Sequence, residues 1–187
     1  TFNIPIAVYQ VSGEYSMIKA GVKMGYFNHN EVLIESHIKD ALIRLNPEIT
    51  ARPELAEEVI YKLRAILISV NQIGLVRANE EFSFWIAGEK TMPFGENNAH
   101  VPVRLIDLDD LSNNQYIITN QFRIHQRETK IPDIVMMING IPVVVGEAKT
   151  PIRPAISWLD GAHDIHDIYE NSIPQLFVPN ILSFATE

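Results

Sequence analysis

The sequence predicts an α/β domain in which helices flank a central mixed β-sheet. Three observations carry this prediction: two early stretches have apolar residues at helical spacing, several short β-prone segments follow, and a further helix and strand come last. This order is typical of an α/β sandwich and not of a helix bundle. The 187 residues fit one domain, for which about 100–200 residues is usual.

The first half of the chain is predicted to be mainly helical beyond an N-terminal segment. Residues 1–28 contain a β-prone stretch at 4–11 and scattered glycines, and they are not assigned to an element. From a cap at Asn30, apolar residues recur every three or four positions up to Leu45, and Asn46-Pro47 ends this helix. Pro53 is a good first residue for a second helix, which we expect to reach about Val70.

The second half is predicted to build the sheet. Segments separated by Gly and Asn clusters predict strands at 81–86, 103–107, 116–123, 134–138 and 143–147. Pro151 and Pro154 interrupt the chain, and Ser157 is predicted to cap a helix that extends to about residue 170. Residues 177–184 form the last expected strand.

Composition excludes several classes of protein. With no cysteine, the chain has no disulfide framework, no Cys-ligated metal and no thiol nucleophile. We expect a cytoplasmic protein without a membrane contact, because no apolar run approaches the roughly 20 residues of a membrane span and the start lacks a signal-peptide pattern. A net charge of −8 argues against strong stand-alone binding to nucleic acid. Because the chain begins with Thr1, we expect a fragment of a larger protein.

The most informative segment, 131–149, consists of two apolar strands around Asn139-Gly140, which is a strong hairpin signal. Its open end carries Asp133, Glu147 and Lys149, and a hairpin brings such open ends together. Two neighbouring carboxylates repel unless a cation lies between them, and hard oxygen ligands suit Mg²⁺ or Mn²⁺. The lysine can orient or deprotonate a water and neutralise charge on a phosphate. The segment therefore predicts metal-assisted phosphodiester hydrolysis.

The register of this hairpin tests the prediction. A simple two-residue turn would place Asp133 opposite Gly146 and direct Glu147 to the other face of the sheet. The site therefore requires an odd loop, a β-bulge near Pro142, or an Asp133 just outside the regular strand. The alternative interpretation is a Lys–Glu surface pair on an edge strand, with an unrelated Asp in a turn.

Several blocks along the chain, at fitting intervals, resemble a known family. The blocks are Val103-Arg104-Leu105-Ile106-Asp107, Asn113-Asn114, Asn120-Gln121-Phe122, Pro132-Asp133-Ile134-Val135, Asn139-Gly140-Ile141-Pro142-Val143-Val144-Val145, Glu147-x-Lys149, Tyr169, Ile173-Pro174-Gln175-Leu176-Phe177 and Asn180. Together they resemble the N-terminal nuclease domain of the R (restriction and translocation) subunit of type I restriction enzymes, which belongs to the PD-(D/E)xK nuclease superfamily. The resemblance covers residues 31–184 and implies a restriction-endonuclease-like core, so residues 1–187 are expected to form a single nuclease domain.

The resemblance also implies roles for individual residues. It makes Asp133 and Glu147 the metal ligands and Lys149 the catalytic lysine. It implies that Glu35, on the first helix, can complete the metal site, although a solvated helix face explains Glu35 equally well.

A second family motif, Gln-x-x-x-Tyr on the helix after the lysine, is matched only in part. Tyr169 fits the motif, but Ile165 stands at the Gln position. His166 is a candidate substitute for the missing Gln. A surface or core role is the alternative for this histidine.

Basic residues flank the hairpin and are candidates for contacts with the DNA backbone. They are Arg123, Arg127, Lys130 and Arg153. Scattered surface charge is the alternative interpretation.

Together, the residues and the resemblance predict that the chain is the endonuclease domain of a type I site-specific deoxyribonuclease. We expect it to depend on Mg²⁺, for which Mn²⁺ can substitute, and to act on double-stranded DNA. The resemblance implies methylation and specificity subunits as partners and two RecA-like ATPase domains elsewhere in the subunit. ATP belongs to those domains, because this chain has no Gly-x-x-x-x-Gly-Lys-Ser/Thr loop. Two alternatives stay open: a non-catalytic module that docks DNA or subunits, and a free-standing nuclease such as a junction resolvase or repair enzyme.

Overall fold

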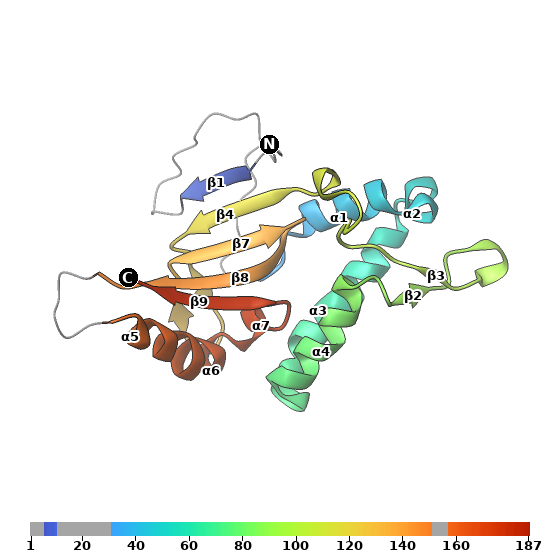
Figure 1. The fold of residues 1–187 in the computed structure, drawn as a ribbon. Coiled ribbons are helices and arrows are strands. Elements are labelled where there is room, and N and C mark those ends of the chain that lie inside the picture. The colour runs from blue at the N-terminus through green and yellow to red at the C-terminus, as the bar shows by residue number, and fades with distance from the viewer. Residues whose placement is uncertain (1–5, 11–30, 151–156) are drawn as a thin grey trace.

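A five-stranded mixed sheet lies at the centre of the computed structural model, which describes residues 6–10, 31–150 and 157–187 (Figure 1). Across the sheet the strands are β1 (Ile6–Gln10), β4 (Tyr116–Asn120), β7 (Ile134–Ile138), β8 (Ile141–Ala148) and β9 (Leu182–Thr186). Strands β4, β7 and β8 are antiparallel neighbours, whereas β1 and β9 join the two edges in parallel. The parallel pairing of β9 with β8 requires a crossover connection, which the C-terminal helices provide.

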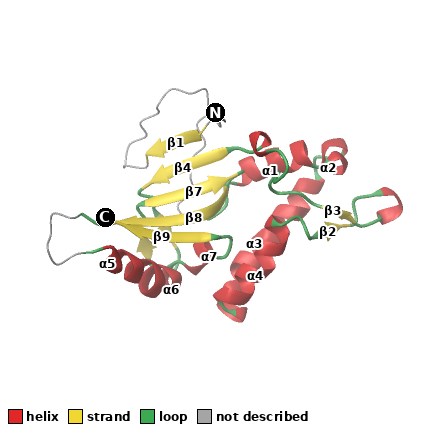
Figure 2. Cartoon of the chain, in the orientation of Figure 1, coloured by secondary structure: helices red, strands yellow, loops and turns green. Residues whose placement is uncertain are grey.

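The α-helices gather in two groups beside the sheet (Figure 2). The first group lies near the turn between β7 and β8 and contains α1 (Glu35–Leu45), α2 (Pro47–Ala51), α3 (Leu55–Ile73) and α4 (Leu75–Ile86). The second group contains α5 (Trp158–His163), the π-helical turn η3 (Asp164–Tyr169), α6 (Glu170–Ser172) and α7 (Pro174–Phe177). In this group α5 packs against β8 and β9 and η3 packs against β8, whereas α7 packs against α3 and α4 of the first group. None of the described helices is long and apolar enough to cross a membrane.

Short elements complete the described chain. They are the ribbon β2 (Thr91–Met92) with β3 (Val101–Pro102), the ribbon β5 (Ile124–His125) with β6 (Thr129–Lys130), and the 3₁₀ turns η1 (Glu96–Asn98) and η2 (Leu111–Asn113).

Most of the predicted elements are present. The first helix begins at Glu35 and ends before Asn46, while the predicted cap Asn30 and most of segment 1–28 lie outside the described residues. The second helix, α3, runs three residues beyond the predicted end to Ile73, where Gly74 ends it with a φ of +81°. Ser157 caps α5 with a full capping box, as expected.

Two predicted strands are wrong. Residues 81–86 belong to helix α4, in which Ala78, Phe82 and Trp85 recur at helical spacing and are buried in the core. Aromatic residues favour strands in a short window, but this longer periodicity decides the structure. Residues 103–107 form a loop, because the Asn46 side chain satisfies the backbone of Arg104 in place of a neighbouring strand. Of the stretch 177–184, only the end is a strand, since α7 occupies Phe177 and β9 begins at Leu182.

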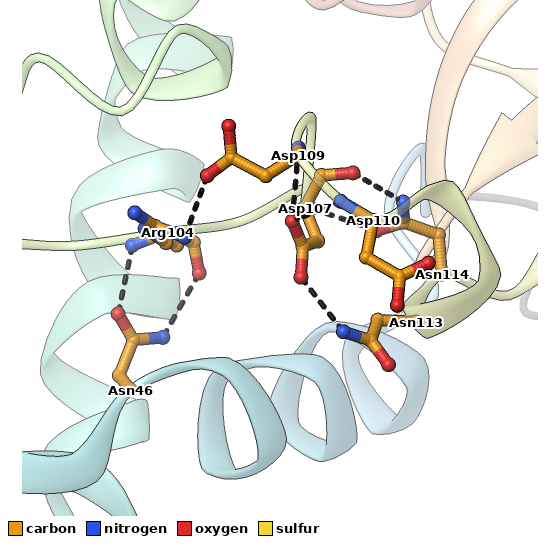
Figure 3. A network of polar contacts seen from close by, with 7 residues as sticks. All are labelled: Asn46, Arg104, Asp107, Asp109, Asp110, Asn113 and Asn114. Carbon is orange, nitrogen blue, oxygen red and sulfur yellow. Dashed lines mark hydrogen bonds and ion pairs between the residues drawn. The ribbon is translucent and has the colours of Figure 1, made fainter.

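A network of polar contacts holds this loop in place (Figure 3). The Asp107 carboxylate accepts hydrogen bonds from the Asn113 side chain (2.8 Å) and from the backbone N–H groups of Asp110 and Asp109 (3.0 Å each). The Asn113 bond, followed by the backbone bonds, lowers the pKa of Asp107 below its ordinary value. Asn114 continues the network, because its side-chain oxygen accepts from Asn139, 2.9 Å away in the hairpin turn. The network therefore ties the loop to the β7–β8 hairpin.

The hairpin turn itself has the backbone that Asn-Gly favours. Asn139 and Gly140 have φ values of +51° and +81°, as in a type I′ turn. The turn also supports the start of α1, because the Ile34 N–H donates to the Gly140 carbonyl oxygen at 2.9 Å. A methyl group added at Gly140 would lie 2.6 Å from the Ile34 carbonyl oxygen and 2.9 Å from the Cβ of His37.

We therefore expect Gly140→Ala to lower the free energy of unfolding by about 3 kcal/mol, from backbone strain together with this clash. Gly88→Ala is the matched control, because Gly88 has a φ of +74° but nothing lies within 4 Å of an added methyl. That control should lose only about 1 kcal/mol. Urea unfolding of both variants measures the difference, and equal losses would show that the contact with α1 contributes nothing.

Candidate active site

A β-bulge brings the two hairpin carboxylates to the same face of the sheet. Ile138 pairs with Ile141 and Met137 with Pro142, but Met136 then pairs with Val144, so that Val143 is the extra residue. The bulge shifts the register by one position, and Ile134 pairs with Gly146. Continued by one residue, this register places Asp133, just outside β7, opposite Glu147 on β8. Of the three arrangements that the sequence left open, the structure therefore contains the bulge near Pro142, and it also places Asp133 just outside the regular strand.

Glu147 is a buried carboxylate with two side-chain partners. The residue is only 5% exposed, and an unpaired charge at such a position is costly. Its Oε1 lies 2.9 Å from the Lys149 ammonium, and its Oε2 accepts a hydrogen bond from the Tyr169 hydroxyl at 3.1 Å. These two donors hold the Glu147 carboxylate in place.

Asp133 lies at the same end of the hairpin. Its Oδ2 accepts a hydrogen bond from the Ala148 backbone N–H at 2.9 Å, which fixes the carboxylate beside strand β8. The Tyr169 hydroxyl has a pKa well above its ordinary value, mainly because the group is buried. The negative charges of Glu147, Asp164 and Asp133 raise this pKa further. The Tyr169 hydroxyl is therefore a fixed donor that lies within electrostatic reach of all three carboxylates.

Lys149 bridges two carboxylates. Its ammonium contacts Asp164 Oδ2 as well as Glu147 Oε1. Burial alone would lower the pKa of Lys149, but the ion pairs with Asp164 and Glu147 outweigh it and raise the pKa well above its ordinary value. In this arrangement Lys149 is a charged hydrogen-bond donor to two carboxylates.

Asp164 is a residue of this cluster that sequence reasoning missed. It opens the π-helical turn η3, and Tyr169 closes it. In the regular α-helix expected from the sequence, residues five apart point about 140° away from each other. In a π-helical turn, bonds from i to i+5 instead stack such residues on one face. No helical periodicity in the sequence signals this turn.

The cluster has the charge and the ligand type of a divalent-cation site. Three carboxylates (Asp133, Glu147 and Asp164) and one ammonium (Lys149) give a local charge of −3 + 1 = −2. In the three described stretches, no group of three or more His, Asp or Glu side chains is arranged to hold a metal ion by itself. Mg²⁺ is commonly held by one or two carboxylates together with substrate phosphates and waters, which Asp133 and Glu147 fit.

The structure does not bring the other candidate ligands to this cluster. Glu35 forms an ion pair with Arg64 of α3 and lies at the start of α1, beside the hairpin turn and at the opposite end of β8 from Glu147. His166 has a side chain that is 77% exposed and pairs with Glu170 at 3.1 Å. Ile165 is buried in the hydrophobic core. The polar group of this helix that contacts Lys149 is Asp164.

The predicted basic residues have varied surroundings. The Arg127 guanidinium donates to the Asn171 carbonyl oxygen at 3.1 Å and to Asn71 Oδ1 at 2.8 Å. Lys130 pairs with Glu128 at 2.8 Å. Arg123 is exposed between β4 and β5, and Arg153 lies outside the described residues. Arg127 and Lys130 thus bind groups of the chain itself.

Two curated relatives resemble most of the chain. A type I restriction enzyme HindI endonuclease subunit from Haemophilus influenzae is 30% identical over 154 residues, which are 80% of this chain. A protein of Methanocaldococcus jannaschii that carries the name of a type I restriction enzyme MjaIXP endonuclease subunit is 26% identical over 157 residues, or 81% of this chain. The matched segments are only 14% and 15% of the lengths of these relatives.

Other comparisons are more limited. A delta-aminolevulinic acid dehydratase from Methanothermus sociabilis is 43% identical, but over only 60 residues and 32% of the chain. No solved structure matches the chain at a significant level.

The family model described as "Type I restriction enzyme R protein N terminus" matches residues 7–187. The chain therefore belongs to the family of type I restriction enzyme R protein N termini.

Proposed function

We propose that this chain is the Mg²⁺-dependent endonuclease domain of a type I restriction enzyme R subunit and hydrolyses phosphodiester bonds of double-stranded DNA. The observation that carries the proposal is the bulged β7–β8 hairpin, which places Asp133 beside the buried Glu147 with the Lys149 ammonium next to it. A catalytic or metal-binding role gives a simple reason for collecting these charges at the end of two apolar strands.

In the proposed reaction, Asp133 and Glu147 would hold Mg²⁺, for which Mn²⁺ can substitute. When bound, such a cation supplies Lewis-acid activation of water and phosphate. Tyr169 keeps the Glu147 carboxylate oriented through its 3.1 Å hydrogen bond. Lys149 carries its positive charge, so it can orient the attacking water by hydrogen bonding and offset the charge that develops on the phosphate. These roles give the chain the arrangement of a PD-(D/E)xK nuclease.

The wider setting is also proposed. The matched relatives are named as endonuclease subunits and are much longer than this chain. We place ATP binding and DNA translocation in the remainder of such a subunit, and we expect methylation and specificity subunits as partners in the cytoplasm. The net charge of −8 makes strong independent DNA binding unfavourable, so DNA is delivered to the site by the rest of the complex.

One observation favours a second function, a non-catalytic docking module that keeps the nuclease fold. The Lys149 ammonium already pairs with both Glu147 and Asp164, so these three side chains also make sense as a purely structural ion-pair cluster. Such a module would assemble and contact DNA without cutting it.

Asp133→Asn distinguishes the two functions. The substitution keeps the side-chain shape and its ability to accept from Ala148, but it removes a charged metal ligand. In the complete restriction complex we expect DNA cleavage to fall by about 10²-fold or more, with subunit assembly and ATP hydrolysis unchanged. Asp109→Asn is the matched control, because that carboxylate is 83% exposed and remote in the 103–114 loop. Cleavage at the parent rate by the Asp133→Asn complex would favour the docking module.

A further inference from the structure

We infer that Asp164 is a positioning residue of the proposed nuclease: it shares the Lys149 ammonium with Glu147 and thereby keeps Glu147 accessible to a divalent cation. The inference rests on the proposed function but adds a residue to it. It starts from the contact between Asp164 Oδ2 and Lys149 Nζ, which joins the C-terminal helices to strand β8.

The backbone holds Asp164 in this place. In η3 the residues at the two ends of the turn, Asp164 and Tyr169, lie on the same face, because hydrogen bonds in a π-helix join residues five apart. Both side chains contact the cluster, Tyr169 through Glu147 and Asp164 through Lys149. Ile165, which immediately follows Asp164, is buried in the core and fixes the rotation of the helix.

Close packing at Gly161, one turn earlier, brings the helix against the site. A methyl group added at Gly161 would lie 3.5 Å from the Cγ atoms of both Glu147 and Lys149. The helix backbone thus passes close to the aliphatic parts of Glu147 and Lys149, which its own Tyr169 and Asp164 contact with their polar ends. These contacts give Asp164 a fixed position relative to strand β8.

The consequence concerns competition at Glu147. A divalent cation at this carboxylate must share it with the Lys149 ammonium, which now lies 2.9 Å from Oε1. Asp164 provides a second carboxylate for the ammonium, so the lysine does not depend on Glu147 alone. Without the Asp164 charge, the ammonium would pair with Glu147 only, and the local charge would change from −2 to −1. Both changes disfavour a divalent cation.

The test compares Asp164→Asn, Asp164→Glu and Asp167→Asn in the complete restriction complex. Asparagine keeps the shape of Asp164 without its charge, and glutamate keeps the charge on a longer arm. Asp167 is the matched control, since it lies on the same turn but is 56% exposed and pairs with His163. Two quantities are measured: the rate of DNA cleavage, and Mn²⁺ binding to the R subunit by electron paramagnetic resonance.

For Asp164→Asn we expect cleavage to fall about 10- to 100-fold, as for other residues that orient a metal site, and the Mn²⁺ dissociation constant to rise about 10-fold. Asp164→Glu should recover most of both losses, and Asp167→Asn should match the parent. A purely structural Asp164 would leave Mn²⁺ binding unchanged in the folded Asn variant, which would overturn the inference. Glu147→Gln is measured in parallel. If the Glu147→Gln complex still cleaves DNA, the proposed function is wrong. If it does not cleave but the Asp164→Asn complex matches the parent, only the role of Asp164 is wrong.

Discussion

Glu147→Gln is expected to reduce DNA cleavage by the complete restriction complex by about 10³-fold or more. Glu147 is the most buried charged residue of the cluster, and it contacts both Lys149 and Tyr169. Glutamine keeps the side-chain shape and one acceptor oxygen for these donors, so the fold should persist, but the variant loses the charge that holds the cation. ATP hydrolysis and translocation, which we place elsewhere in the subunit, should proceed at the parent rate.

Single-turnover cleavage of a plasmid that carries the recognition site measures this effect, with ATP hydrolysis followed in the same reaction. Glu57→Gln is the control, because Glu57 forms a surface ion pair with Lys39. Cleavage by Glu147→Gln within a few-fold of the parent rate would rule out Glu147 as a metal ligand.

Lys149→Met is expected to have effects of opposite sign on stability and on cation binding. Methionine fills the space of the lysine stem but leaves Glu147 and Asp164 without their shared counter-ion. Removing one partner of a fully buried ion pair costs about 3–5 kcal/mol. Because Lys149 and Asp164 are 19% and 26% exposed, we expect a smaller loss of about 2 kcal/mol in the free energy of unfolding, measured in the presence of a chelator.

Divalent cations should reverse this loss. The local charge of the Lys149→Met site is −3, and no ammonium competes for Glu147, so Mn²⁺ should bind more tightly than to the parent and raise the melting temperature further. Cleavage should nevertheless fall about 10²-fold, because no charged donor faces the phosphate. Thermal unfolding with and without Mn²⁺ checks the first result. A variant that is as stable as the parent without metal and gains nothing from Mn²⁺ would contradict this account of the cluster.

The hairpin and the meeting of Asp133 and Glu147 at its open end were largely predictable from the sequence. Asn139-Gly140 predicts the turn, and the need to place Asp133 and Glu147 on one face leaves three arrangements, of which the structure contains the bulge near Pro142 and an Asp133 outside the regular strand. Both predictions rest on local rules, since the turn needs positive φ and side chains alternate along a strand.

Other features were not predicted from short segments of the sequence. Residues 81–86 are helical because the helical spacing of Ala78, Phe82 and Trp85 extends beyond the short window in which aromatic residues favour a strand. Asp164 joins the site through a π-helical turn, whose five-residue spacing no amphipathic pattern reveals. Glu35 was expected near the metal site, but the fold places the start of α1 beside the hairpin turn, where Glu35 pairs with Arg64.

The most direct test of the central claim is the position of a divalent cation. A crystal of the R subunit grown with Mn²⁺ and a short DNA duplex should show an anomalous peak about 2.1 Å from carboxylate oxygens of both Asp133 and Glu147, with the Lys149 ammonium beside the phosphate. An anomalous peak elsewhere would contradict the claim that Asp133 and Glu147 hold the catalytic metal. So would a DNA-bound structure that has no peak and in which Lys149 still bridges Glu147 and Asp164.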